Sequence, residues 1–177
     1  MLSDTFRKRL WHEATERVAY AVLDGAQNKS LLDWLFSADP PKFECLFAGE
    51  LDPDIAEVAP YLVQLAPETR FTQELIEAGW DKNWGVLLVS SEELPVVWRH
   101  LRQHTLVYGP ELEPMYFRFY DPRVLRMFLP TCDSTQLSDF FGCIDLFLSE
   151  AEDPAQAAAD VWSLANGQLL RERVGVA

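Results

Sequence analysis

The sequence predicts a single α/β domain, a mixed sheet of short strands flanked by helices, followed by a helical C-terminal tail. Short apolar segments typical of strands alternate along the chain with segments whose apolar residues recur at helical spacing. The chain has 177 residues, of which 49% are hydrophobic and 24% charged, an ordinary globular composition with the length for one well-filled core. We place the domain at residues 1–149 and the tail at residues 150–177.

Turn-forming residues divide the first half of the chain into strands and helices. A strand at 17–23 ends at Asp24-Gly25, and Pro40-Pro41 breaks the helix that follows. The expected elements are a strand at 17–23, a helix at 31–36, a strand at 43–47, a short helix from Pro53, a strand at 61–65 and a helix at 69–79. Segment 84–89 is almost continuously apolar, which is typical of a strand buried on both faces.

Helix start signals are frequent in the second half. Ser90 and Glu93 have the spacing of a capping box ahead of an amphipathic helix, and a hairpin with strands at 105–108 and 115–120 follows. Asp121-Pro122 places a carboxylate cap before a proline at the first helical position. A short helix from Asp133 and a last strand at 144–148 complete the domain. The alanine-rich sequence beyond residue 150 predicts a helical tail, either loosely docked or bound to a partner.

The net charge of −13 excludes several classes of partner. The acidic excess is spread along the chain, and a protein this acidic is repelled by phosphate backbones and by anionic membranes. No stretch of about 18 apolar residues occurs, and the N-terminus lacks the apolar segment of a secretory signal. The three cysteines, Cys45, Cys132 and Cys143, include no C-x-x-C pair. We therefore expect a cytoplasmic protein with reduced thiols that binds neither nucleic acid nor membrane.

Catalytic motifs are missing from the sequence. It contains no G-x-S-x-G elbow, no P-loop and no G-x-G-x-x-G loop. His100 and His104 have the i, i+4 spacing of a zinc site, but no glutamate follows the first histidine and no third ligand is evident. We expect no enzyme activity, no metal and no cofactor.

Aromatic and arginine side chains are the candidates for partner binding. Trp80 and Trp84 bracket a polar interruption, where they serve either as loop anchors or as interaction hot spots. Arg118, Arg123 and Arg126 lie close together in an acidic chain, where they either pair with neighbouring acids or bind a partner. The candidate partner-binding residues are Trp80, Trp84, Arg118, Asp121, Arg123 and Trp162, although Asp121 is also expected to be a structural helix cap.

Several segments in a fixed order carry a resemblance to a known family. They are AVLDGA at 21–26, LFAGEL at 46–51, VAPYL at 58–62, WG at 84–85, LR at 101–102, FRFYDPRVL at 117–125, LPTC at 129–132 and FFG at 140–142. Together they resemble the effector-adaptor domain of bacterial type VI secretion systems, also called an effector chaperone and long catalogued as a domain of unknown function. The resemblance covers roughly residues 17–149.

The resemblance implies a cytoplasmic protein that binds a cognate secreted effector and assists its loading onto the VgrG spike. We expect the bound segment to be held by apolar and aromatic contacts with acidic residues around the rim, because six tryptophans have no catalytic motif to explain them. The alternative is an acidic immunity protein that neutralises a toxin by direct binding.

Overall fold

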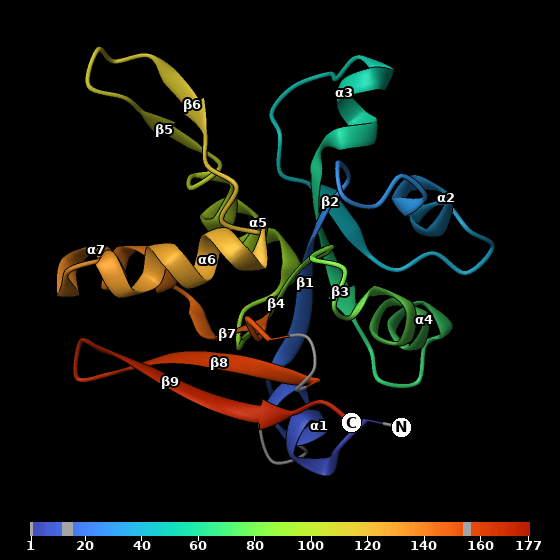
Figure 1. Cartoon of the computed structure of the whole chain (residues 1–177). Helices are drawn as coiled ribbons and strands as arrows, with labels where there is room; N and C mark the ends of the chain where they lie inside the picture. Colours follow the sequence, from blue (N-terminus) through green and yellow to red (C-terminus); the bar gives the residue numbers. More distant parts are fainter. Residues whose placement is uncertain (1, 12–15, 154–156) are drawn as a thin grey trace.

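A seven-stranded antiparallel sheet forms the centre of the molecule (Figure 1). The computed structural model describes residues 2–11, 16–153 and 157–177. The strands are β1 (Val18–Asp24), β2 (Phe43–Cys45), β3 (Pro60–Leu65), β4 (Gly85–Ser90), β7 (Ile144–Glu150), β8 (Ala158–Ala165) and β9 (Gln168–Gly175), and their order across the sheet is β2-β3-β1-β4-β7-β8-β9. Short helices connect most of them, which confirms the predicted α/β domain.

The helices lie mostly where the periodicity predicts them. They are α1 (Asp4–Leu10), α2 (Leu31–Leu35), α3 (Pro53–Val58), α4 (Arg70–Gly79), α5 (Leu94–Arg102), α6 (Pro122–Phe128), the 3-10 turn η1 (Leu129–Thr131) and α7 (Ser134–Phe141). Helix α1 was not predicted. A separate two-stranded ribbon of β5 (Leu106–Tyr108) and β6 (Pro114–Tyr116) forms the expected hairpin and projects from the body at the upper left of Figure 1.

Both faces of the central strands of the sheet are buried, so the domain has two apolar layers. Alternate residues of β1 enter different layers: Ala21 and Leu23 pack with α1, α2 and α4, whereas Tyr20 and Val22 pack with α5, α6 and α7. The nearly continuous apolar sequence of β4 follows from this arrangement, because every residue from Val86 to Ser90 is buried. The predicted strand buried on both faces is therefore confirmed.

Strand direction differs from the prediction of a mixed sheet. Among the described residues, every pair of neighbouring strands in the large sheet is antiparallel. An alternation of strands and helices along the sequence is compatible with either direction. Direction depends on which strands become neighbours, and periodicity carries no information about that choice.

Local capping explains several helix starts. Asp133 and Gln136 form a complete capping box at α7, and Thr69 caps α4 by accepting a hydrogen bond from the Thr72 amide. The capping box predicted for Ser90 and Glu93 is not formed, because Ser90 is the buried last residue of β4. Its hydroxyl donates instead to the Cys143 carbonyl at 2.7 Å, and Glu93 is itself the N-cap residue of α5.

The C-terminal tail is a β-hairpin, so the predicted helical tail at 150–177 is wrong. Strands β8 and β9 pair along their whole length and extend the sheet beyond β7. Asn166 and Gly167 connect them, both with positive φ (52° and 74°), as a tight two-residue hairpin turn requires. Alanine-rich composition favours a helix in isolation, but burial of alternate side chains against both layers of the core decides in favour of strands.

The N-terminal helix is fixed to the end of this hairpin. The backbone amide and hydroxyl of Ser3 donate to the carbonyls of Val176 (2.9 Å) and Gly175 (2.6 Å), and Phe6 and Leu10 of α1 are fully buried. The two ends of the chain consequently lie close together in Figure 1. Within the part of the chain that the structure describes, no helix is both long enough and apolar enough to cross a bilayer.

Candidate protein-interaction surface

Trp80 and Trp84 anchor a tight turn between α4 and β4. Asp81 and Asn83, between them, both adopt positive φ (65° and 54°). The Trp80 ring meets Phe6 edge to face at 5.3 Å, and the Trp84 ring meets Trp34 in the same way at 5.5 Å. Both tryptophans are half-buried against the layer formed by α1, α2 and α4. Their contacts fit the loop-anchor interpretation rather than a free aromatic hot spot.

A buried carboxylate fastens the same turn to the sheet. Glu150, at the end of β7, accepts hydrogen bonds from the Asn83 backbone amide at 3.1 and 3.2 Å. Burial, assisted by the negative charge of Asp81, raises the pKa of Glu150 to about 7. The carbonyl of Glu150 accepts a hydrogen bond from Arg126 Nη1 at 2.5 Å. Sequence reasoning missed this residue, because only the tertiary structure brings Glu150 to a turn 67 residues away.

Two arginines of the predicted cluster, Arg118 and Arg123, form ion pairs with buried carboxylates. Arg118 pairs with Asp24, which is completely buried at the end of β1. Arg123 donates hydrogen bonds to the Asp121 carboxylate from Nε at 2.9 Å and from Nη2 at 2.7 Å. Its backbone amide donates to the same carboxylate at 2.9 Å. Burial acts to raise the pKa of Asp121, but these hydrogen bonds outweigh it and hold the pKa below its ordinary value. The geometry is that of a fold-stabilising cluster, with both guanidinium groups already engaged.

Trp162 lies in the core, which corrects its expected role in a partner interface. It stands in the middle of β8 and is 1% exposed. Its indole N–H donates to the Ser149 hydroxyl at 3.1 Å, and the Arg171 guanidinium covers the ring at 5.0 Å from the centroid. The error follows from the misassigned tail, since a tryptophan in a loosely docked helix would have been accessible.

The histidine pair packs one helix against another. His100 of α5 and His104 in the turn after it lie edge to face, with ring centroids 4.9 Å apart, and His100 Nε2 lies 2.9 Å from the Phe140 carbonyl of α7. Burial, together with the neighbouring His100, lowers the pKa of His104 to about 4. Among the described residues, no group of three or more histidine, cysteine or acidic side chains is arranged to hold a metal ion.

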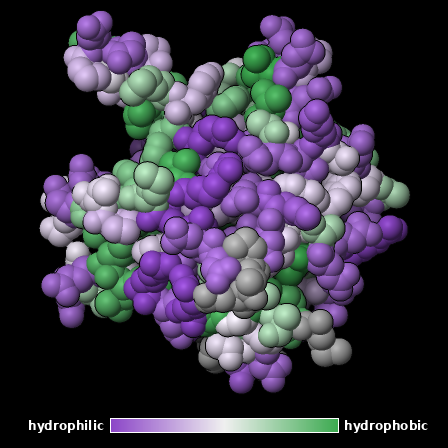
Figure 2. Space-filling model, viewed as in Figure 1, coloured by the Kyte–Doolittle hydropathy of each residue, from purple (hydrophilic) through white to green (hydrophobic). Residues whose placement is uncertain are grey.

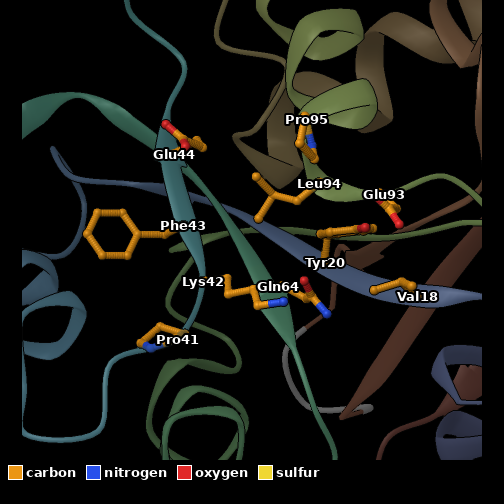
Figure 3. Close-up of a pocket in the computed structure, with 10 residues that line it drawn as sticks. All are labelled: Val18, Tyr20, Pro41, Lys42, Phe43, Glu44, Gln64, Glu93, Leu94 and Pro95. Carbon is orange, nitrogen blue, oxygen red and sulfur yellow. The ribbon is translucent and has the colours of Figure 1, made fainter.

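An open hollow of about 740 Å³ lies where the first strands of the sheet meet the start of α5 (Figure 3). Its lining residues are Val18, Tyr20, Pro41, Lys42, Phe43, Glu44, Gln64, Glu93, Leu94 and Pro95. Figure 3 shows Lys42 and Gln64 on one side, Tyr20 and Glu93 on the other, and the Phe43 ring turned away. An enclosed, mainly apolar pocket is typical of small-molecule sites, and this open hollow, lined by polar and apolar side chains alike, lacks that character.

The β5–β6 hairpin exposes a set of large apolar side chains that the sequence did not single out as a site. Tyr108 and Tyr116 are each 66% exposed, and Leu112 at the tip is 79% exposed. Leu106, Val107 and Met115 are also exposed. The Tyr116 ring meets Phe47 at 4.7 Å, which links the hairpin to the segment between β2 and α3. Such a concentration of exposed apolar side chains on a projecting element is typical of protein-interaction surfaces.

A family model matches residues 19–139 of the chain, over two thirds of its length. Its description is Domain of unknown function (DUF4123). The chain belongs to this family. The DUF4123 region runs from β1 into α7, so it contains the projecting hairpin, the tryptophan turn and both arginines of the ion pairs. Strands β7, β8 and β9 lie beyond it and complete the same sheet. No curated protein and no solved structure matches the chain significantly.

Proposed function

We propose that this DUF4123 protein is an adaptor that binds a cognate type VI secretion effector in the cytoplasm and assists its loading onto the VgrG spike. The match to the family model over residues 19–139 carries the proposal, together with the resemblance of the ordered segments to effector-adaptor domains. An adaptor acts by binding, and a binding role agrees with a sequence that carries no recognised catalytic motif.

The experiment is affinity purification of the tagged protein from its native host, followed by mass spectrometry and a secretion assay. We expect one protein, the effector, to copurify in a stoichiometric amount. Deletion of the adaptor gene is expected to stop export of that protein while the spike itself is still exported. Continued export of the copurifying protein in the deletion strain would refute the adaptor role.

An immunity protein is the second candidate, and the net charge of −13 favours it, since an acidic protein suits a basic toxin. The two functions differ in what deletion does to the host. Loss of an immunity protein poisons the cell that makes the toxin, whereas loss of an adaptor leaves the cell healthy and the toxin unexported. Gene order separates them as well: an adaptor gene is expected between a spike gene and an effector gene, and an immunity gene directly after its toxin.

A further inference from the structure

The two sides of the β5–β6 hairpin carry different apolar side chains. Directly paired residues of an antiparallel ribbon lie on the same side, and successive pairs alternate between the two sides. The pair Leu106 and Tyr116 therefore shares one side with the pair Tyr108 and Pro114. Val107 and Met115 lie on the other side. We call the first side, with Phe47 in contact with Tyr116, the hairpin face.

The main sheet does not support the hairpin. Strands β5 and β6 have three residues each, and among the described residues they pair only with each other. Backbone hydrogen bonds from Phe117 to Thr105 (3.0 Å) and from Gly109 to Glu113 (2.9 Å) close its two ends. A two-stranded ribbon is marginally stable in water by itself. Figure 2 shows the hairpin as a lobe at the upper left, separated by a notch from the lobe that contains α3.

Acidic residues predominate in the two chain segments that carry this surface. Between Lys42 and Pro60, the stretch that includes Phe47, the chain has five acidic residues and no basic one: Glu44, Glu50, Asp52, Asp54 and Glu57. Between Arg102 and Arg118, the stretch that includes the hairpin, the acids are Glu111 and Glu113, again with no lysine or arginine. Both glutamates are exposed near the hairpin tip. A partner that covers the apolar side chains therefore meets more acidic than basic side chains in these two segments.

We propose that the hairpin face is the docking site for a basic segment of the partner protein, one that presents large apolar side chains between lysine or arginine residues. The inference rests on the proposed function, because this segment would belong to the effector. Apolar contact with Tyr108, Tyr116 and Phe47 supplies the affinity, and the surrounding acids attract and orient the segment. Binding also stabilises a hairpin that is marginal when exposed.

The test uses short synthetic peptides and fluorescence anisotropy. One peptide alternates lysine with leucine and tryptophan, a second replaces each lysine by glutamate, and a third replaces each apolar residue by serine. We expect the first to bind at least about tenfold more tightly than the other two. The double variant Tyr108→Ser/Tyr116→Ser is expected to weaken its binding by about thirtyfold.

Met127→Ser is the matched control, because Met127 is 77% exposed on α6, outside the hairpin. Equal binding of the three peptides, or full binding to the hairpin variant, would overturn the proposal. So would light scattering that detects a dimer which the hairpin variant disperses, since a second copy of the chain would then occupy the face.

The purification experiment with the same variants separates this inference from the proposed function. If the effector copurifies equally with the hairpin variant, the adaptor role stands and the docking site is wrong. If no effector copurifies with the unmodified protein but the cationic apolar peptide binds through the hairpin, the docking site stands and the adaptor role fails.

Discussion

Buried carboxylates at the ends of strands and helices are held in different ways in this protein. Asp24 has an arginine partner, Asp121 has an arginine and a backbone amide, and Glu150 has a backbone amide but faces another acid. Hydrogen bonds from Arg123 hold the pKa of Asp121 below its ordinary value, whereas burial and the charge of Asp81 raise the pKa of Glu150 to about 7. Asp121 and Glu150 therefore affect stability differently when the pH changes.

Replacement of Asp121 by alanine is expected to destabilise the fold without changing its architecture. The side chain caps α6 and binds Arg123, so the loss should cost about 1–2 kcal/mol. Asp121→Asn keeps the capping oxygen and removes the charge, and we expect it to recover most of the loss. Urea unfolding with an unchanged slope measures both variants. If the asparagine variant were as unstable as the alanine variant, the ion pair rather than the cap would be the main contribution.

The protonation of Glu150 is expected to make stability fall as the pH rises. In the unfolded chain this carboxyl ionises near its ordinary pKa of 4.5, whereas burial and Asp81 raise the folded pKa to about 7 despite Arg126 and the Asn83 amide. Between these values the folded state holds a proton that the unfolded state releases, so this contribution to stability decreases with increasing pH.

Glu150→Gln isolates this effect, because the amide keeps an oxygen acceptor and cannot ionise. Across the window from pH 4.5 to 7 we expect the variant to gain roughly 1–3 kcal/mol relative to the unmodified protein. Urea unfolding at several pH values within the window measures the difference. A difference that stays constant with pH would mean that Glu150 is ionised throughout.

Local sequence predicted the Asp121 cap but not the partners of the arginines. A cap depends on residues that are two or three positions apart, so the Asp-Pro pair was sufficient evidence. Arg118 was expected to pair with a neighbouring acid, yet its partner Asp24 lies 94 positions earlier in the chain. The same limit applies to Glu150 and to the accessible apolar face of the hairpin, since both depend on what the folded chain covers.

The secondary-structure elements repeat this contrast between local and distant information. The hairpin was predicted and is present, because its strands and its turn are adjacent in sequence. The tail was misread, because the helix propensity of its alanines is outweighed by burial against both faces of the core. The Asn166-Gly167 pair was the available signal, a two-residue turn typical of hairpins.

The tail hairpin is expected to be an essential part of the domain. Trp162 of β8 packs among Phe147, Val86 and other residues of the layer that contains α7, so Trp162→Ala should cost about 3–5 kcal/mol. Leu170→Ala on β9 is the control, because this side chain is 50% exposed, and it should cost less than about 1 kcal/mol. Urea unfolding compares the two. Equal stability of the two variants would instead support a tail that is only loosely attached to the domain.

At the scale of the whole molecule, the negative charge and the apolar hairpin face are expected to control different steps of binding. Charge acts over about 10 Å at ordinary ionic strength and steers a basic partner before contact. Apolar side chains act only after contact, when water has left the interface. Charge should therefore set the association rate, and the hairpin face should set the dissociation rate.

Stopped-flow or biosensor kinetics with the cationic apolar peptide tests this separation. The first variant is the triple Glu50→Gln/Asp52→Asn/Asp54→Asn, close to the hairpin. The second is the triple Asp33→Asn/Asp39→Asn/Glu77→Gln, on and beside α2 and α4. The third is Tyr116→Ser. The first triple should slow association several-fold at low salt and flatten its salt dependence, and the second should do so much less, because its acids lie away from the hairpin (Figure 1). Tyr116→Ser should raise the dissociation rate by about tenfold or more and leave association nearly unchanged. If both triples slowed association equally, the net charge of −13 rather than its placement would guide the partner, and the acids near the hairpin would have no special role.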